Sequence, residues 1–227
     1  MKTQDLARCI DHTLLRADAT ANDIKTLCAE AREHNFYSVC VNGSRVAQAC
    51  HFLEGSEVKV ATVVGFPLGA TDSDTKRFET EAAIDNGAQE IDLVIPIGRL
   101  KEGDDNYVLR ELRDVAEAAD ERPVKVILET CLLTREEKIR GCQLVLDSGA
   151  RFVKTSTGFS AGGATIEDVK LLREIVREKL GVKAAGGIRD TLTAIAMIEA
   201  GASRLGTSSG VAIVRGLAGA SPGVGLY

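Results

Sequence analysis

Two lysines lie where strand-like segments end in small residues, and this placement could give them a role in chemistry. Lys154 belongs to the run FVKTSTGF (residues 152–159), and Lys183 belongs to VKAAGGIR (residues 182–189). Because side chains alternate between the two faces of a strand, each ammonium points to one face near the carboxyl end of its strand. The plain alternative is a lysine that reaches water or pairs with an acid. Two such lysines on neighbouring units favour chemistry.

The chemistry that suits a pair of lysines is nucleophilic attack on a carbonyl carbon. A lysine must lose its proton to attack, and at a pKa of about 10.4 only about 0.04% of it is neutral at pH 7. A second ammonium about 6 Å away, at an effective dielectric of about 20, contributes about 2.8 kcal/mol or about two pK units. Desolvation lowers the pKa further. One lysine would attack and the other would stay charged and activate it, but the residues alone do not say which is which.

An acid in another strand could join the two lysines. Asp92 lies within EIDLVI (residues 90–95), and alternation puts it on the face opposite Ile91 and Leu93. An inward Asp is costly unless it is paired or hydrogen-bonded, so Asp92 is either a catalytic group or a structural partner for a lysine. In a barrel, Asp92 and Lys154 lie on even-numbered strands and can share one interior layer, while Lys183 on an odd-numbered strand lies in a staggered layer. The three charged groups can therefore meet.

The elements that must position these residues form a β/α repeat. Gly-Ala at the end of a helical segment, followed by two residues and a strand, occurs in DNGAQEIDLV, DSGARFVKT and EAGASRLGT. Each glycine suits the left-handed residue that ends a helix. Strands are predicted over residues 8–13, 37–42, 58–65, 90–95, 124–129, 152–155, 182–185 and 204–207. Helical periodicity lies between them, for example over residues 23–34, 74–87, 106–120, 134–149 and 165–181.

Strict alternation of strand and helix predicts a parallel sheet. Eight such units close most naturally into a (β/α)8 TIM barrel, with a doubly wound sheet as the alternative. The first predicted strand is not followed by G-x-G-x-x-G, which disfavours a dinucleotide-binding version of that sheet. Since no linker divides the 227 residues, we expect one barrel domain over residues 1–227, with the glycine-rich residues 219–227 as a flexible tail.

Composition and charge indicate small-molecule partners. The net charge of -5 disfavours attraction to nucleic acid or to an anionic membrane. The first residues contain no leader sequence and no apolar run of about 18 residues, so a cytoplasmic location is expected. The six cysteines form no C-x-x-C pair and the three histidines are scattered. Reduced thiols and a mechanism without a metal are therefore expected.

The segments after the last three predicted strands, TSTGF, AAGGIR and GTSSG, are rich in glycine and serine. In a barrel they meet at the carboxyl ends of the strands, where backbone amides can hold a phosphate. Taken singly, each glycine is more simply explained as a turn. Together the three segments favour a phosphorylated substrate, bound by Gly158, Gly186, Gly187, Ser208 and Ser209.

With these segments in this order, the chain resembles the deoxyribose-phosphate aldolase family of class I, Schiff-base-forming aldolases. The matching segments are IDHTLL (10–15), VCVN (39–42), VVGFPLG (63–69), EIDLVI (90–95), KVILET (125–130), FVKTSTGF (152–159), VKAAGGIR (182–189) and RLGTSSG (204–210). Short segments such as GTSSG are weak evidence, but FVKTSTGF and VKAAGGIR at this spacing are specific. Two positions differ from the family's pattern: Pro96 stands where the family usually has Asn, and Gly43 stands where it often has Pro. Neither position matches a catalytic residue of the family.

The resemblance implies a carbon-carbon lyase that reversibly cleaves 2-deoxy-D-ribose 5-phosphate to acetaldehyde and D-glyceraldehyde 3-phosphate in deoxyribonucleoside catabolism. It implies that Lys154 is the Schiff-base lysine and Lys183 the cation that activates it. Asp92 would be the acid/base residue, working with an ordered water. The C-terminal Tyr227 would transfer protons to and from the enamine carbon.

The resemblance also implies the surroundings of the site. Asp11, Cys40 and Thr155 would line the substrate pocket, with Asp11 as a partner for Lys183. The reaction would need no cofactor, and members of the family are often homodimers. Two alternatives remain open. One is another Schiff-base aldolase acting on a keto sugar phosphate, and the other is a non-catalytic barrel that binds a sugar phosphate.

Overall fold

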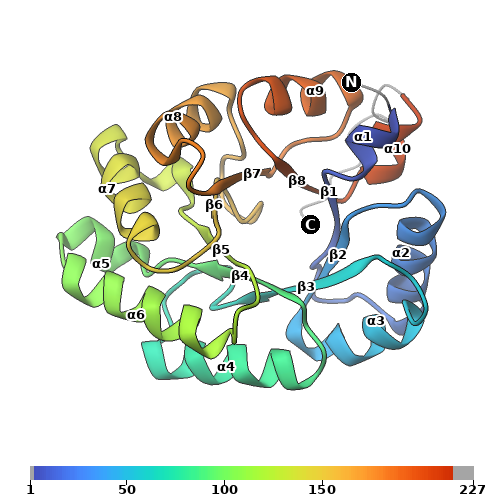
Figure 1. The fold of residues 1–227 in the computed structure, drawn as a ribbon, viewed down its shortest axis with the longest axis horizontal. Helices are drawn as coiled ribbons and strands as arrows, with labels where there is room; N and C mark the ends of the chain where they lie inside the picture. Colours follow the sequence, from blue (N-terminus) through green and yellow to red (C-terminus); the bar gives the residue numbers. More distant parts are fainter. Residues whose placement is uncertain (1–2, 217–227) are drawn as a thin grey trace.

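The computed structural model describes residues 3–216, within which eight parallel strands close into a barrel (Figure 1). The strands are β1 (Ile10–Leu14), β2 (Ser38–Val41), β3 (Lys59–Val64), β4 (Glu90–Val94), β5 (Val124–Ile127), β6 (Phe152–Lys154), β7 (Gly181–Ala185) and β8 (Arg204–Thr207). Each pairs with the next in sequence, and β8 pairs with β1. This closure confirms the predicted TIM barrel over the doubly wound sheet, which would have two open edges. The predicted flexible tail (219–227) and Tyr227 lie outside the described residues.

Helices surround the barrel on its outside (Figure 1). They are α1 (Thr3–Ala7), α2 (Ala21–Glu33), α3 (Val46–Phe52), α4 (Ser73–Asp85), α5 (Ile97–Glu102), α6 (Asp105–Ala118), α7 (Arg135–Leu146), α8 (Ile166–Val176), α9 (Thr191–Glu199) and α10 (Gly210–Val214), with 3-10 turns η1 (Gly43–Arg45) and η2 (Thr130–Leu132). The five helical segments predicted from periodicity are all present, and their ends differ by a few residues. The sequence did not predict α1 or α5.

The ends of the helices explain the repeat in the sequence. Gly87, Gly149 and Gly201, which follow α4, α7 and α9, have φ angles of 101°, 92° and 115°. Side chains other than glycine rarely adopt this region, so the glycine lets the chain leave the helix and enter the next strand. At the other end, Thr20 and Thr134 form capping boxes that begin α2 and α7. Each such cap stabilises its helix by about 1 kcal/mol.

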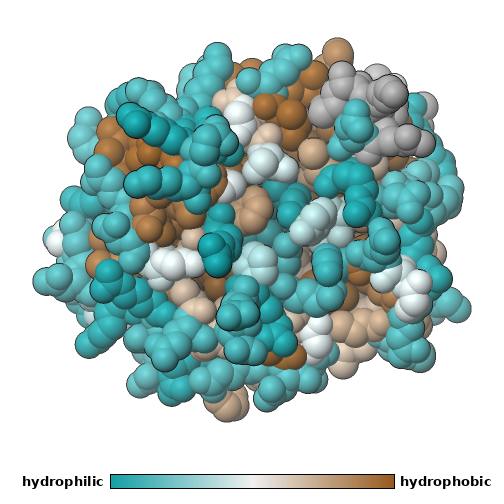
Figure 2. Space-filling view, in the orientation of Figure 1, coloured by the Kyte–Doolittle hydropathy of each residue, from teal (hydrophilic) through white to brown (hydrophobic). Residues whose placement is uncertain are grey.

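The main apolar packing lies between the strands and the helices, and the inside of the barrel holds a charged cluster and a smaller apolar one. Ile91 and Leu93 are fully buried in the main apolar core, so Asp92 between them points to the opposite face, as alternation predicts. Hydrophilic side chains cover most of the surface in Figure 2, and hydrophobic ones gather in patches such as the one at the upper left, near α7 and α8. Within residues 3–216, none of the helices is both long enough and apolar enough to span a bilayer.

A buried ion pair ties α4 and α6 to the barrel. Lys76 Nζ lies 2.5 Å from Glu111 Oε1 and donates hydrogen bonds to the carbonyl oxygens of Gly69 at 3.0 Å and Val94 at 3.1 Å. Both charged side chains are fully buried. Burial lowers the pKa of Lys76 and raises the pKa of Glu111. Each group therefore depends on the other to stay ionised.

Removing one partner of this pair is expected to destabilise the fold strongly. Glu111→Ala leaves the Lys76 ammonium buried without its carboxylate, which should lower the free energy of unfolding by about 3–5 kcal/mol. The double replacement Lys76→Met and Glu111→Leu leaves no buried charge and should cost much less. Urea unfolding of the three proteins measures both values. Equal losses in the single and double variants would contradict this account.

Candidate active site

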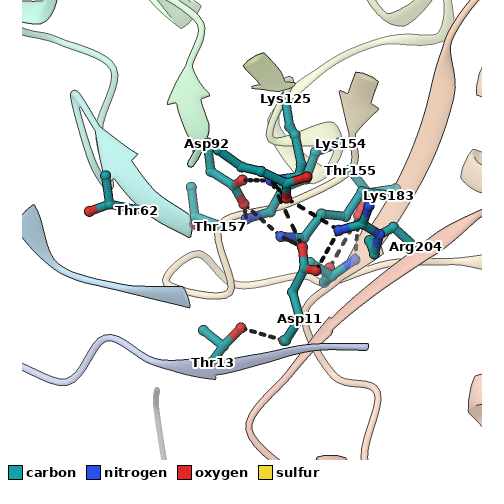
Figure 3. A network of polar contacts seen from close by, with 12 residues as sticks. Asp11, Thr13, Thr62, Asp92, Lys125, Lys154, Thr155, Thr157, Lys183 and Arg204 are labelled. Atoms are coloured by element: carbon teal, nitrogen blue, oxygen red, sulfur yellow. Dashed lines mark hydrogen bonds and ion pairs between the residues drawn. The ribbon is translucent and has the colours of Figure 1, made fainter. Parts of the chain in front are cut away.

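Side chains from β4, β6 and β7 meet at one carboxylate oxygen inside the barrel (Figure 3). Asp92 Oδ2 accepts hydrogen bonds from Lys154 Nζ at 2.8 Å and from Lys183 Nζ at 2.7 Å. The two lysines are also direct partners in the pairing of β6 with β7. All three side chains are buried. The structure thus brings together the three residues that the sequence selected, although they are up to 91 positions apart.

Lys183 lies between two carboxylates. Its Nζ is 2.5 Å from Asp11 Oδ2, in addition to its contact with Asp92. Asp11 is held in turn through Oδ1, which accepts hydrogen bonds from Ser38 Oγ at 2.7 Å and from Arg204 at 2.8 Å. Burial opposes the charge on Lys183, but Asp11 and Asp92 outweigh it and raise the pKa of this lysine. Lys183 therefore stays an ammonium.

Lys154 contacts only one of these carboxylates, Asp92. Burial lowers the pKa of Lys154 and the nearby Lys183 ammonium lowers it further, while Asp92 only partly opposes them. The pKa values of the two lysines thus shift in opposite directions. A lowered pKa favours the neutral form of an amine that a nucleophile needs, and a raised pKa favours the ammonium.

A third lysine, which the sequence analysis did not select, holds the other oxygen of Asp92. Lys125 Nζ in β5 lies 2.8 Å from Asp92 Oδ1 and 2.7 Å from Glu90 Oε2, and it is fully buried. Burial alone would raise the pKa of Asp92, but Lys125, Lys154 and Lys183 together hold it well below its usual range. The available signal was the alternation in VKVI, which places Lys125 opposite its apolar neighbours just as in the run around Lys154.

These groups form what we call the interior charge network, which consists of Asp11, Glu90, Asp92, Lys125, Lys154, Lys183 and Arg204. Its formal charges are four positive and three negative, which sum to +1 (4 − 3). Loss of the proton from Lys154 brings the sum to zero. An uncompensated charge is costly inside a protein. The network as a whole therefore favours a neutral Lys154, in agreement with its lowered pKa.

The two further pocket residues expected from the resemblance differ in their surroundings. Cys40 is fully buried beside an apolar cluster that includes Phe66 and Phe159, whose rings pack edge to face at 5.1 Å. Burial raises the pKa of Cys40 to about 11, so it remains a thiol. Thr155 uses its hydroxyl between strands, where it donates to the carbonyl of Ala185 and accepts from the Ala185 amide, both at 3.1 Å. Its hydroxyl thus joins the ends of β6 and β7.

The residues expected to bind phosphate lie on three contiguous loops, after β6, β7 and β8. The Ala164 amide donates to the carbonyl of Gly186 at 3.0 Å, which links the loops after β6 and β7. Thr207 Oγ1 donates to the carbonyl of Ile188 at 2.6 Å, which links the loops after β7 and β8. The loops carry the five expected residues Gly158, Gly186, Gly187, Ser208 and Ser209, and the three glycines have φ angles between 80° and 90°. These hydrogen bonds hold the three loops together at the carboxyl ends of the strands, where the phosphate site was expected.

Tyr227, the expected proton donor, lies outside the described residues. Among residues 3–216, no cluster of three or more His, Cys, Asp or Glu side chains is arranged to hold a metal ion.

Comparisons with known proteins agree with the geometry. A family model described as DeoC/LacD family aldolase matches residues 6–216. A deoxyribose-phosphate aldolase from Alkaliphilus oremlandii is 60% identical over 211 residues, which cover 92% of this chain and 95% of the relative. One from Thermococcus gammatolerans is 56% identical over 220 residues, which cover 95% of this chain and 98% of the relative. A solved structure of deoxyribose phosphate aldolase from Aeropyrum pernix, described as a unique tetrameric structure, has a TM-score of 0.89 at 32% identity. The match covers 94% of this chain and 91% of that one.

Proposed function

Because this chain belongs to the DeoC/LacD family of aldolases, we propose that it cleaves 2-deoxy-D-ribose 5-phosphate through a Schiff base on Lys154. The products are acetaldehyde and D-glyceraldehyde 3-phosphate, and the reaction is reversible. One observation carries the assignment of residues. Asp92 contacts both Lys154 and Lys183, yet the pKa of Lys154 is lowered and that of Lys183 is raised.

The first half of the proposed mechanism forms the imine. Neutral Lys154 attacks the aldehyde carbon of the open-chain sugar, and the resulting carbinolamine loses water to give a protonated imine. The imine nitrogen is Lys154 Nζ, which lies 2.8 Å from Asp92 Oδ2. The cation therefore forms beside a carboxylate that stabilises positive charge. Asp92 exchanges the protons that carbinolamine formation and water loss require, working through an ordered water.

The second half breaks the carbon-carbon bond. The hydroxyl on C3 gives its proton through the ordered water to Asp92, the C2–C3 bond breaks, and the electron pair of that bond moves to the protonated imine to leave a neutral enamine. Glyceraldehyde 3-phosphate then departs. Protonation of the enamine carbon, assigned to Tyr227, and addition of water release acetaldehyde and regenerate neutral Lys154. The glycine-rich loops after β6, β7 and β8 are proposed to hold the phosphate through their backbone amides.

Two further properties belong to this proposal. All six cysteines are free thiols, and three of them are buried, which supports a reducing, cytoplasmic location. A homodimer is proposed from the family resemblance. The exposed apolar side chains Leu68 and Phe78 provide a surface that a second copy would cover.

The activity is tested by supplying the substrates directly. With 2-deoxy-D-ribose 5-phosphate, we expect acetaldehyde and glyceraldehyde 3-phosphate in equal amounts. In the reverse direction, acetaldehyde alone should serve as the donor to glyceraldehyde 3-phosphate. A requirement for a keto sugar phosphate or its ketone fragment would identify the alternative aldolase. Binding of the sugar phosphate without turnover would identify a non-catalytic barrel.

A further inference from the structure

We propose that Glu129 is a positioning residue that shapes the loop after β6 for the phosphate-bearing part of the substrate. The inference rests on the proposed function and adds a residue to it. Glu129 follows β5 at the catalytic end of the barrel, and only 1% of it is exposed. The mechanism above does not use it. A buried carboxylate requires hydrogen-bond donors. The Cys131 thiol donates to Glu129 Oε1 at 3.9 Å, and three further donors come from the loop after β6.

The carboxylate holds a short stretch of that loop through three donors. Its Oε2 accepts hydrogen bonds from the hydroxyls of Thr157 and, at 3.0 Å, Ser160. Its Oε1 accepts from the backbone amide of Thr157 at 3.3 Å. The Thr157 hydroxyl also accepts the amide of Phe159 at 3.0 Å. Glu129 therefore fixes both sides of Gly158, one of the residues assigned to the phosphate.

The backbone of Glu129 supports a dedicated role for its side chain. Its φ and ψ angles of 57° and 63° lie in the left-handed region, which is unfavourable for residues other than glycine. Backbone hydrogen bonds on either side hold this conformation, from Leu128 N to Lys154 O and from Thr130 N to Thr155 O, both at 3.0 Å. A glycine would adopt these angles more easily. A glutamate here is consistent with selection for its carboxylate rather than for its backbone.

The loop that Glu129 fixes also packs against the segments after β3 and β7. Phe159 packs edge to face on Phe66, and the backbone at Gly158 lies close to Gly186, where an added Cβ would be 3.6 Å from Gly158 Cα. Lys154 Nζ, in contrast, is held by Asp92 from β4 and not by this loop. Loss of the Glu129 carboxylate should therefore disturb binding of the phosphate end more than formation of the imine.

The test compares two substrates that differ only in the phosphate. In Glu129→Ala, the KM for 2-deoxyribose 5-phosphate should rise by about tenfold or more, because hydrogen bonds to a charged group are lost. For unphosphorylated 2-deoxyribose, kcat/KM should change by less than about threefold, since that substrate does not use the phosphate loops. Glu129→Gln should recover part of the loss, because its amide oxygen can still accept the Thr157 amide.

The matched control is Glu111→Gln, which changes another buried carboxylate that lies between α4 and α6. It should lower the thermal midpoint without changing the ratio of the two kcat/KM values. The inference would be overturned if Glu129→Ala lowered kcat/KM equally for both substrates, or if it left the KM for 2-deoxyribose 5-phosphate unchanged. If Glu129→Ala does not fold, Glu129→Gln and Ser160→Ala test the inference instead. Both should raise the KM for 2-deoxyribose 5-phosphate while changing kcat/KM for 2-deoxyribose much less. Borohydride trapping of acetaldehyde on Lys154 separates the two proposals, because its failure in the unmodified protein contradicts the proposed function itself.

Discussion

Lys154→Met is expected to abolish aldol cleavage, with a loss in kcat of at least about 10⁴-fold. The variant has no other amine ready to form the imine in the interior charge network. Lys125 and Lys183 are both buried among carboxylates that raise their pKa values, so they remain protonated. The methionine has a similar shape and leaves Asp92 paired with the other two lysines. The fold should therefore survive.

Covalent trapping measures the same prediction directly. In the unmodified protein treated with acetaldehyde and borohydride, one ethyl group should replace a hydrogen of Lys154, so the peptide that contains Lys154 should gain the mass of C2H4. Lys154→Met should show no gain, and the exposed helix lysine in Lys170→Met should leave trapping and turnover unchanged. No mass increase in the unmodified protein, or an increase on Lys183, would contradict the assignment of the nucleophile.

The parts of the fold that could be predicted from the sequence depend on local patterns. The Gly-Ala repeat and the apolar alternation located all eight strands to within a few residues, because a helix end and a strand face are set by neighbouring positions. The same alternation placed Asp92, Lys154 and Lys183 on inward faces. The short helix α5 was missed because it is only six residues long and has no side-chain cap.

The contacts inside the barrel could not be predicted in the same way, because they depend on register. Lys125 meets Asp92 since the two are direct partners between β4 and β5, and Arg204 reaches Glu90 across 114 positions of sequence. One slip in register would move each side chain to the other face. The left-handed backbone of Glu129 had no signal either, since glycine is the residue that usually marks such a conformation.

The second large effect is expected at the activating lysine. Lys183→Met should lower kcat/KM at pH 7 by about 100-fold. The Nζ atoms of Lys183 and Lys154 lie 2.7 Å and 2.8 Å from the same Asp92 oxygen, and loss of an ammonium about 5 Å away at an effective dielectric of about 20 changes the pKa by about two units. The formal charges of the interior charge network then sum to zero only when Lys154 keeps its proton. The pKa of Lys154 should rise, and activity that requires the neutral amine is lost below that pKa. The acidic limb of the pH-rate profile should therefore move to higher pH, and near-normal turnover at pH 7 would contradict the activating role.

A compensating change shows whether Lys183 acts through its charge or through direct proton transfer. Asp11 is the second carboxylate beside Lys183, at 2.5 Å. In Lys183→Met combined with Asp11→Asn, the remaining formal charges are those of Lys125, Arg204, Glu90 and Asp92, which sum to zero with Lys154 neutral. If Lys183 acts through its charge, the double variant should have a lower Lys154 pKa than Lys183→Met and regain part of its activity at pH 7. Equal activity in the single and double variants would contradict a role through charge alone. It would show that the Lys183 ammonium itself must be present to transfer a proton, because Asp11→Asn restores the net charge but not that ammonium.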